Sequence, residues 1–148
     1  MSTGLSFPRI RTATRGGGRF IIPTAPSNGT SVADGTGGVY GSWVEMVAAT
    51  TNALFITAVT IANSDLNSIW VQLDIGTGAA ASEVSVGEVV FGLSNSTTAN
   101  GVRADLSGCP IPVPAGTRIA CRCATDIGTE SPQVWLECID QADLPGVI

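Results

Sequence analysis

Apolar and polar residues alternate over much of the chain after residue 38, which is the pattern of β-strands. The clearest example is residues 69–75 (IWVQLDI), where the odd positions are aliphatic and the even positions are Trp70, Gln72 and Asp74. A period of two predicts a strand with one covered face, so the aliphatic side chains are expected to point inward and Asp74 outward. The same criteria predict further strands at residues 39–49, 53–62, 83–91, 101–108, 117–125 and 134–141.

Two of these segments depart from simple alternation. Residues 53–62 (ALFITAVTIA) are apolar at both odd and even positions, so Leu54 and Val59 are expected on opposite faces, both of them covered. In residues 83–91 a glycine, Gly87, interrupts the run and predicts a β-bulge. No ten-residue window has helical periodicity. The sequence therefore predicts an all-β fold, an antiparallel β-sandwich with jelly-roll topology favoured.

The last two predicted strands flank a turn-rich segment and are expected to pair as a hairpin. A register that sets Arg122 against Glu137 on one face also sets Cys121 against Cys138 on the other. A slip of one residue would mix the two faces, which favours this register. It would permit a disulfide between the two cysteines, but a pair of thiols is the preferred interpretation.

The charges divide the chain into two parts. Before Asp34 there are four arginines and no acidic residue, whereas the remainder has three arginines and all twelve acidic residues, for a net charge of −5. The RGGGR run, several prolines and a Gly/Ser/Thr-rich segment disfavour regular structure in the first part. We expect residues 1–37 to form an extended arm with a linker, and residues 38–148 to form the sandwich body.

Apolar residues lie between the arginines of this arm, which a purely solvating disordered tail would not need. The disordered tail is nevertheless the alternative to an arm that becomes ordered on an acidic partner. The residues expected to contact that partner are Phe7, Arg9, Ile10, Arg11, Arg15, Arg19, Phe20 and Ile21.

The composition restricts the chemistry that the protein can perform. The chain has no histidine, and all seven of its basic residues are arginine. The commonest general base and metal ligand is therefore missing, and we expect no enzyme activity, no cofactor and no metal site. Only 13% of the residues are charged, which is typical of a subunit whose surface neighbours cover. The acidic body and scarce aromatic residues disfavour nucleic-acid binding.

The chain has four cysteines, which we interpret as free thiols: Cys109, Cys121, Cys123 and Cys138. The first residues lack the apolar core of a secretory signal, and the longest apolar run is too short to cross a membrane. We therefore expect synthesis in a cytosol, where thiols remain reduced. There is no C-x-x-C pair for zinc, so burial as small hydrophobic residues is preferred.

Residues 71–83 (VQLDIGTGAAASE) resemble a nucleotide or S-adenosylmethionine site, because a strand ends in an acid and a glycine-rich turn. Such a site needs a crossover helix of about a dozen residues after the turn. Here the next predicted strand begins at residue 83, which leaves no room for that helix. We therefore predict a loop between two strands.

A carbohydrate-active β-sandwich is a further possibility, from a different class of protein. Nothing in the sequence brings together the carboxylates that a glycosidase would use, at Glu45, Asp65, Asp74, Glu83 and Glu88. Three tryptophans could stack on a sugar: Trp43, Trp70 and Trp135. Packing at a sheet or subunit interface is the preferred interpretation of these residues.

Three segments together resemble a group of small tailed-bacteriophage virion proteins that have a β-sandwich body. They are LDIGTGAAASE (residues 73–83), CPIPVPAGTRIACRC (residues 109–123) and YGSWVEMVA (residues 40–48). The resemblance covers roughly residues 40–140, and Cys121 and Cys123 replace small residues of the pattern. It implies a structural role on the virus particle.

The resemblance leads to a specific expectation, a capsid decoration (cement) protein on the outer surface of the virion. Such a protein would be made in the cytoplasm of the bacterial host. Its expected partners are the major capsid protein, bound by the arm, and copies of itself in a homotrimer, with no nucleic acid and no membrane. The alternatives are a phage tail, neck or fibre-associated structural protein, and a carbohydrate-binding β-sandwich.

Overall fold

The computed structural model describes residues 19–24, 28–63, 67–93 and 98–143. Within these residues the chain forms ten β-strands and one short 3-10 turn, η2 (Gln141–Asp143). The strands are β1 (Arg19–Ile22), β2 (Thr30–Ser31), β3 (Val44–Val47), β4 (Leu54–Asn63), β5 (Trp70–Thr77), β6 (Val84–Gly92), β7 (Thr98–Asp105), β8 (Ile111–Val113), β9 (Ile119–Thr125) and β10 (Gln133–Asp140).

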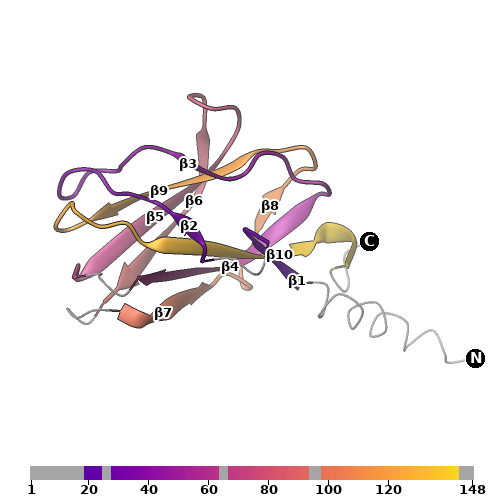
Figure 1. Ribbon diagram of the computed structural model, residues 1–148. Helices are drawn as coiled ribbons and strands as arrows, with labels where there is room; N and C mark the ends of the chain where they lie inside the picture. The colour runs from indigo at the N-terminus through magenta and orange to yellow at the C-terminus, as the bar shows by residue number, and fades with distance from the viewer. Residues whose placement is uncertain (1–18, 25–27, 64–66, 94–97, 144–148) are drawn as a thin grey trace, which may run out of the picture.

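The strands form two antiparallel sheets with an apolar core between them (Figure 1). Sheet A has the order β1-β10-β4-β7, with β2 also paired to β10 and β8 to β4. Sheet B has the order β3-β9-β5-β6. One core cluster includes Leu54 and Leu136 from sheet A and Leu73 and Ile119 from sheet B. The predicted all-β sandwich is therefore confirmed, while the jelly-roll topology stays a prediction.

Strand β5 shows the predicted alternation from its second residue onward. The side chains of Val71, Leu73 and Ile75 are fully buried in the core. Ile69 was predicted to point inward as well, but it precedes the strand and is 49% exposed. The prediction was wrong there because β5 begins only at Trp70, so Ile69 lies before the strand and outside the core.

Strand β4 brings its apolar residues to one face by means of a β-bulge. The pairing with β10 shifts at Glu137, which leaves Thr57 as an extra residue on β4. One extra residue reverses which parity points inward. Leu54 before the bulge and Val59 after it therefore enter the same core cluster, although the sequence placed them on opposite faces.

The predicted hairpin of the last two long strands is wrong. Strand β9 lies in sheet B between β3 and β5, and β10 lies in sheet A between β1 and β4. Arg122 is opposite Asp74 on β5, and Cys121 is opposite Ile75, so neither faces its predicted partner on β10. The segment between these strands carries the chain from one sheet to the other rather than back along the same sheet.

The glycine-rich segment after β5 is a loop between two paired strands, as predicted. Strands β5 and β6 are antiparallel neighbours, and the backbone amide of Ser82 donates to the Ala79 carbonyl at 2.9 Å within their connection. Gly78 has φ of 117°, which favours glycine. The register then shifts so that Val86 is the extra residue on β6, next to the bulge predicted at Gly87.

Part of the segment predicted as an arm pairs with the body. Strand β1 and strand β2 both hydrogen-bond to β10, and Ile22 and Val32 are buried in the core. The predicted contact residues Arg19, Phe20 and Ile21 therefore lie in an edge strand of sheet A. The remaining predicted contact residues, which lie outside the described residues, are Phe7, Arg9, Ile10, Arg11 and Arg15.

All four cysteines are free thiols in the structure, and three of them are buried. Burial raises the pKa of Cys123 and of Cys138 to about 12 each, and it also raises the pKa of Cys121. Cys109, between β7 and β8, is exposed.

We expect one thiol to react with a thiol-exchange reagent in the native protein and four to react after unfolding. The thiolate is the reactive form, so a raised pKa and burial both protect the three core thiols. Counting the released chromophore at pH 8, with and without denaturant, measures this. Substitution of Cys109→Ser should abolish the native signal, and fast reaction of a second thiol would contradict the described packing.

Candidate functional site

Asp74 lies on the outer face of sheet B, away from the core, as the alternation predicted. It is nevertheless fully buried, so pointing outward does not bring it into solvent. The Ser85 hydroxyl donates to Asp74 Oδ1 at 2.5 Å, and Arg122 Nε donates to Asp74 Oδ2 at 2.9 Å. Strand pairing fixes this arrangement, because Asp74 is directly opposite Arg122 on β9.

Two aromatic rings cover this ion pair. The Arg122 guanidinium lies 4.5 Å from the ring centroid of Tyr40 and 4.4 Å from that of Trp43. Contacts of a cation with an aromatic face stabilise both groups when water is excluded. We refer to these residues, together with Asp74, Ser85 and Glu88, as the Arg122 cluster.

Tyr40 joins the cluster to strand β6. Its hydroxyl donates to Glu88 Oε1 at 2.6 Å. Burial and the hydrogen bond to the Glu88 carboxylate both favour the neutral phenol, so the pKa of Tyr40 is raised well above its usual range. The hydroxyl is therefore protonated, and available as a donor, throughout the physiological pH range.

Gly76 explains how Trp43 can lie against the sheet. A Cβ atom at position 76 would be 2.6 Å from the indole ring of Trp43. Gly76 lies within β5 and does not have a positive φ, so the close approach of the ring, rather than a turn, requires glycine here. The glycine that suggested a ligand loop in the sequence thus makes room for a side chain of the same protein.

A second ion-pair group lies beside the first on sheet B. Arg118 Nε donates to Glu45 Oε2 and its Nη1 donates to Glu83 Oε1, each at 2.8 Å. Arg118 Nη1 also donates to the Gly78 carbonyl at 3.3 Å. Desolvation opposes ionisation of Glu83, but hydrogen bonds from the backbone and from Arg118 outweigh it, so the pKa of Glu83 is lowered.

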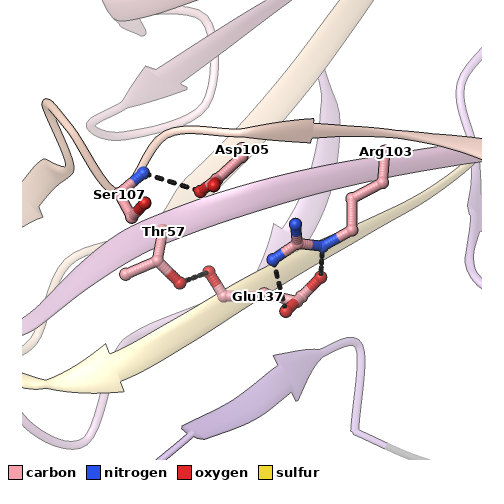
Figure 2. A network of polar contacts seen from close by, with 5 residues as sticks. All are labelled: Thr57, Arg103, Asp105, Ser107 and Glu137. Carbon is pink, nitrogen blue, oxygen red and sulfur yellow. Dashed lines mark hydrogen bonds and ion pairs between the residues drawn. The ribbon is translucent and has the colours of Figure 1, made fainter.

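Sheet A carries a comparable pair on its outer face. Arg103 on β7 and Glu137 on β10 form two hydrogen bonds, of 2.5 and 3.1 Å (Figure 2). Thr57 donates to the Glu137 carbonyl, and Asp105 accepts from the Ser107 amide nearby. The Arg103 hydrogen bond lowers the pKa of Glu137. Glu137 thus has a different arginine from the one predicted from the sequence.

The carboxylates that seemed scattered in the sequence are brought into pairs by these clusters. Asp74 and Glu88 are opposite each other on β5 and β6, and Glu45 and Glu83 share Arg118. In each pair the carboxylates already accept hydrogen bonds from protein side chains. Asp65, the fifth candidate, lies outside the described residues. This arrangement is suited to holding strands and loops together rather than to acid–base catalysis.

The tryptophans weighed as sugar platforms have contacts within the fold. Trp43 covers Arg122, and the ring of Trp135 lies 2.9 Å from where a Cβ atom of Gly29 would be. Trp70 begins β5 opposite Gly92 and is half-buried. The packing interpretation accounts for the first two indoles.

A hollow of about 330 Å³ lies beside β1 and is lined by Phe20, Ile22, Leu54 and Asp140, among others. Asp140 is its single titratable lining group, and Asn52 Nδ2 donates to Asp140 Oδ2 at 3.2 Å. Among the described residues, no group of three or more potential ligands is placed to hold a metal ion. No helix in the described part of the chain is long and apolar enough to span a membrane.

In comparisons with known proteins, no family model, no curated protein and no solved structure matches this chain. The function must therefore be argued from the residues themselves.

We expect Gly76→Ala to destabilise the fold by about 1–3 kcal/mol, because the added methyl group would overlap Trp43. Denaturant unfolding followed by tryptophan fluorescence measures the change. Gly92→Ala is the matched control on the neighbouring strand, since nothing lies within 4 Å of its Cβ position. An equal loss of stability in both variants would show that overlap with Trp43 is not the cause of the destabilisation.

Arg122→Gln should cost about 3 kcal/mol of folding stability, because it leaves the buried Asp74 carboxylate without its cation. This figure lies at the low end of the usual range, since the Arg122 side chain is 32% exposed. Arg103→Gln, which breaks a pair in which the arginine is 45% exposed, should lose clearly less. Chemical denaturation of the two variants side by side tests the order, and a larger loss in the Arg103 variant would contradict it.

Proposed function

We propose that the chain is a bacteriophage capsid decoration protein, which binds the outer surface of the major capsid protein lattice and stabilises the head. The basic segment ahead of β1 would bind acidic groups on neighbouring capsid subunits, and the sandwich would remain on the surface. The observation that carries the proposal is the attachment of this segment. Residues 1–18 contain three arginines and no acid, and they continue directly into β1 at the edge of sheet A.

Strand β1, into which this segment continues, is paired along its whole length. Four residues of β1 are in register with β10, from Arg19 opposite Ile139 to Ile22 opposite Leu136. Ile22 is buried in the core and Phe20 packs against it. A segment anchored in this way transmits a binding force to the body, as a clamp between subunits requires.

The two motifs behind the virion-protein resemblance contact each other in the fold. Arg118, from the PAGTRIA segment, donates to the Gly78 carbonyl and to Glu83 of the GTGAAASE segment. The Gly78 amide donates in return to the Arg118 carbonyl at 3.3 Å. The two segments therefore hold each other in place in one loop structure. This supports treating them as parts of the same kind of β-sandwich body.

Deletion of residues 1–18 should abolish or greatly weaken binding to heads, while the body remains folded. The experiment uses particles of the phage that encodes this chain, prepared without it, and measures occupancy after adding back the full or shortened chain. Deletion should stop before Arg19, because removing β1 would take the buried Ile22 out of the core and confuse unfolding with lost binding. Arg9→Glu, Arg11→Glu and Arg15→Glu combined provide a full-length counterpart.

Unchanged occupancy after deletion would exclude the segment from the mechanism. Absence of the chain from purified virions would exclude the function itself. Copy number separates the related alternatives, since a lattice protein is present in on the order of hundreds of copies and a tail or neck protein in about a dozen or fewer.

A further inference from the structure

The two sheets leave a hollow at one edge of the sandwich. It has a volume of about 330 Å³, and its lining includes residues of an edge strand of each sheet, β1 in sheet A and β3 in sheet B. We call it the β1 hollow. Its apolar lining residues are Phe20, Ile22, Val47, Ala49 and Leu54. All of these except Ala49 belong to the core cluster or pack against it, so the hollow opens directly onto the core. Protein interiors are closely packed, which indicates that a further group fills this opening.

The last described residues of the chain lie at the rim of the β1 hollow. Strand β10 finishes with Asp140, which lines the hollow, and η2 follows directly. The Gln141 amide donates to the Ala53 carbonyl at 2.9 Å, and Gln141 Nε2 donates to the Leu54 carbonyl at 3.3 Å. In Figure 1 this turn, in yellow, lies at the same end of the sandwich as β1. The segment that follows η2 therefore starts beside the hollow.

This segment, LPGVI (residues 144–148), has a composition suited to an apolar hollow. It contains three large aliphatic side chains and no charged side chain. Five residues reach at most about 17 Å, roughly half the length of a ten-residue strand such as β4. The Pro-Gly pair is typical of a β-turn, with proline at the second position and glycine at the third. Such a turn would direct Val147 and Ile148 back toward η2 and the hollow beside it.

The charges of the hollow favour this segment over the basic residues ahead of β1. Asp140 is the one titratable group among the lining residues, and it is only 5% exposed. Asn52 Nδ2 already donates to Asp140 Oδ2 at 3.2 Å. An arginine entering the hollow would lose its hydration against a mainly hydrophobic wall, which costs free energy that an aliphatic side chain does not lose.

We propose that residues 144–148 turn back into the β1 hollow of their own chain and pack their aliphatic side chains against Phe20 and Ile22. Both of these residues are on the inward face of β1. Strand β1 is then held from two directions, by its pairing with β10 within sheet A and by this segment across the hollow. The inference concerns the isolated protein and does not rest on the proposed function.

Disulfide trapping tests where the segment lies. Val147→Cys is combined with Ala49→Cys, at an exposed lining residue, in a Cys109→Ser chain that lacks the exposed native thiol. Mild oxidation should give a disulfide within one chain, because docking holds the two thiols in the same hollow. The matched control pairs Val147→Cys with Ala48→Cys, since Ala48 is the exposed neighbour of Ala49 but does not line the hollow. The control should react at least about tenfold more slowly, because its effective concentration is lower.

Three results of this experiment would overturn the proposal. Equal rates for the two pairs would show that the segment does not prefer the hollow. A covalent dimer in place of the intrachain disulfide would assign the hollow to the corresponding segment of a second copy. Failure of either pair to form a disulfide would place the segment elsewhere.

Hydrogen exchange gives a second test that needs no added cysteine. Deleting residues 144–148 should speed exchange of the β1 backbone amides by roughly tenfold or more, because an edge strand opens more easily when nothing packs on its inward face. Replacing Leu144, Val147 and Ile148 by serine in the full-length chain should have the same effect. Strand β6 is the internal control, since it lies at the edge of sheet B opposite β3, and its amides should keep their rates.

Unchanged exchange in β1, or an equal rise in β1 and β6, would contradict the docking of this segment. Failure of the chain to bind heads would leave the disulfide and exchange measurements unaffected, so this proposal and the proposed function can fail separately.

Discussion

The ion pair between Asp74 and Arg122 organises the outer face of sheet B. A fully buried carboxylate on a sheet surface is costly unless a cation and hydrogen-bond donors surround it. Arg122 supplies the cation and Ser85 a donor, and the rings of Tyr40 and Trp43 keep water away from one side of the guanidinium. The path of the segment before β3 follows from this, because these two rings must lie over the arginine.

Several features of the sequence become intelligible once this pair is known. Gly76 has no side chain because Trp43 occupies that space, and Glu88 lies where it can accept the Tyr40 hydroxyl. The two edges of sheet B also differ. At one edge of sheet B the segment that carries the aromatic rings hydrogen-bonds to β9, whereas no strand of the described residues pairs with the free side of β6 at the other edge.

The class of fold and the nature of the glycine-rich loop could be predicted from the sequence, since both depend on local patterns: alternation in β5 and the lack of space for a helix. The pairing of β9 could not. Arg122 could be matched with Glu137 in a consistent hairpin, but it pairs with Asp74, some fifty residues earlier in the chain, while Glu137 pairs with Arg103. Two opposite-charge solutions fitted the same local pattern, and the choice depends on sheet assignment. The bulge at Thr57 was also invisible, because one inserted residue imitates a strand with two apolar faces.

The position of β1 has a mechanical consequence. It pairs with β10, and β10 is in turn held by β4 over eight register pairs in the middle of sheet A. Tension applied through the residues ahead of Arg19 would therefore load a ladder of several hydrogen bonds and the packed side chain of Ile22 together, before it reached a central strand. Failure under such a load would begin with release of one short edge strand, leaving the β10–β4 ladder and the rest of the core in place. The pairing of β1 with β10 would thus break before the sandwich unfolds.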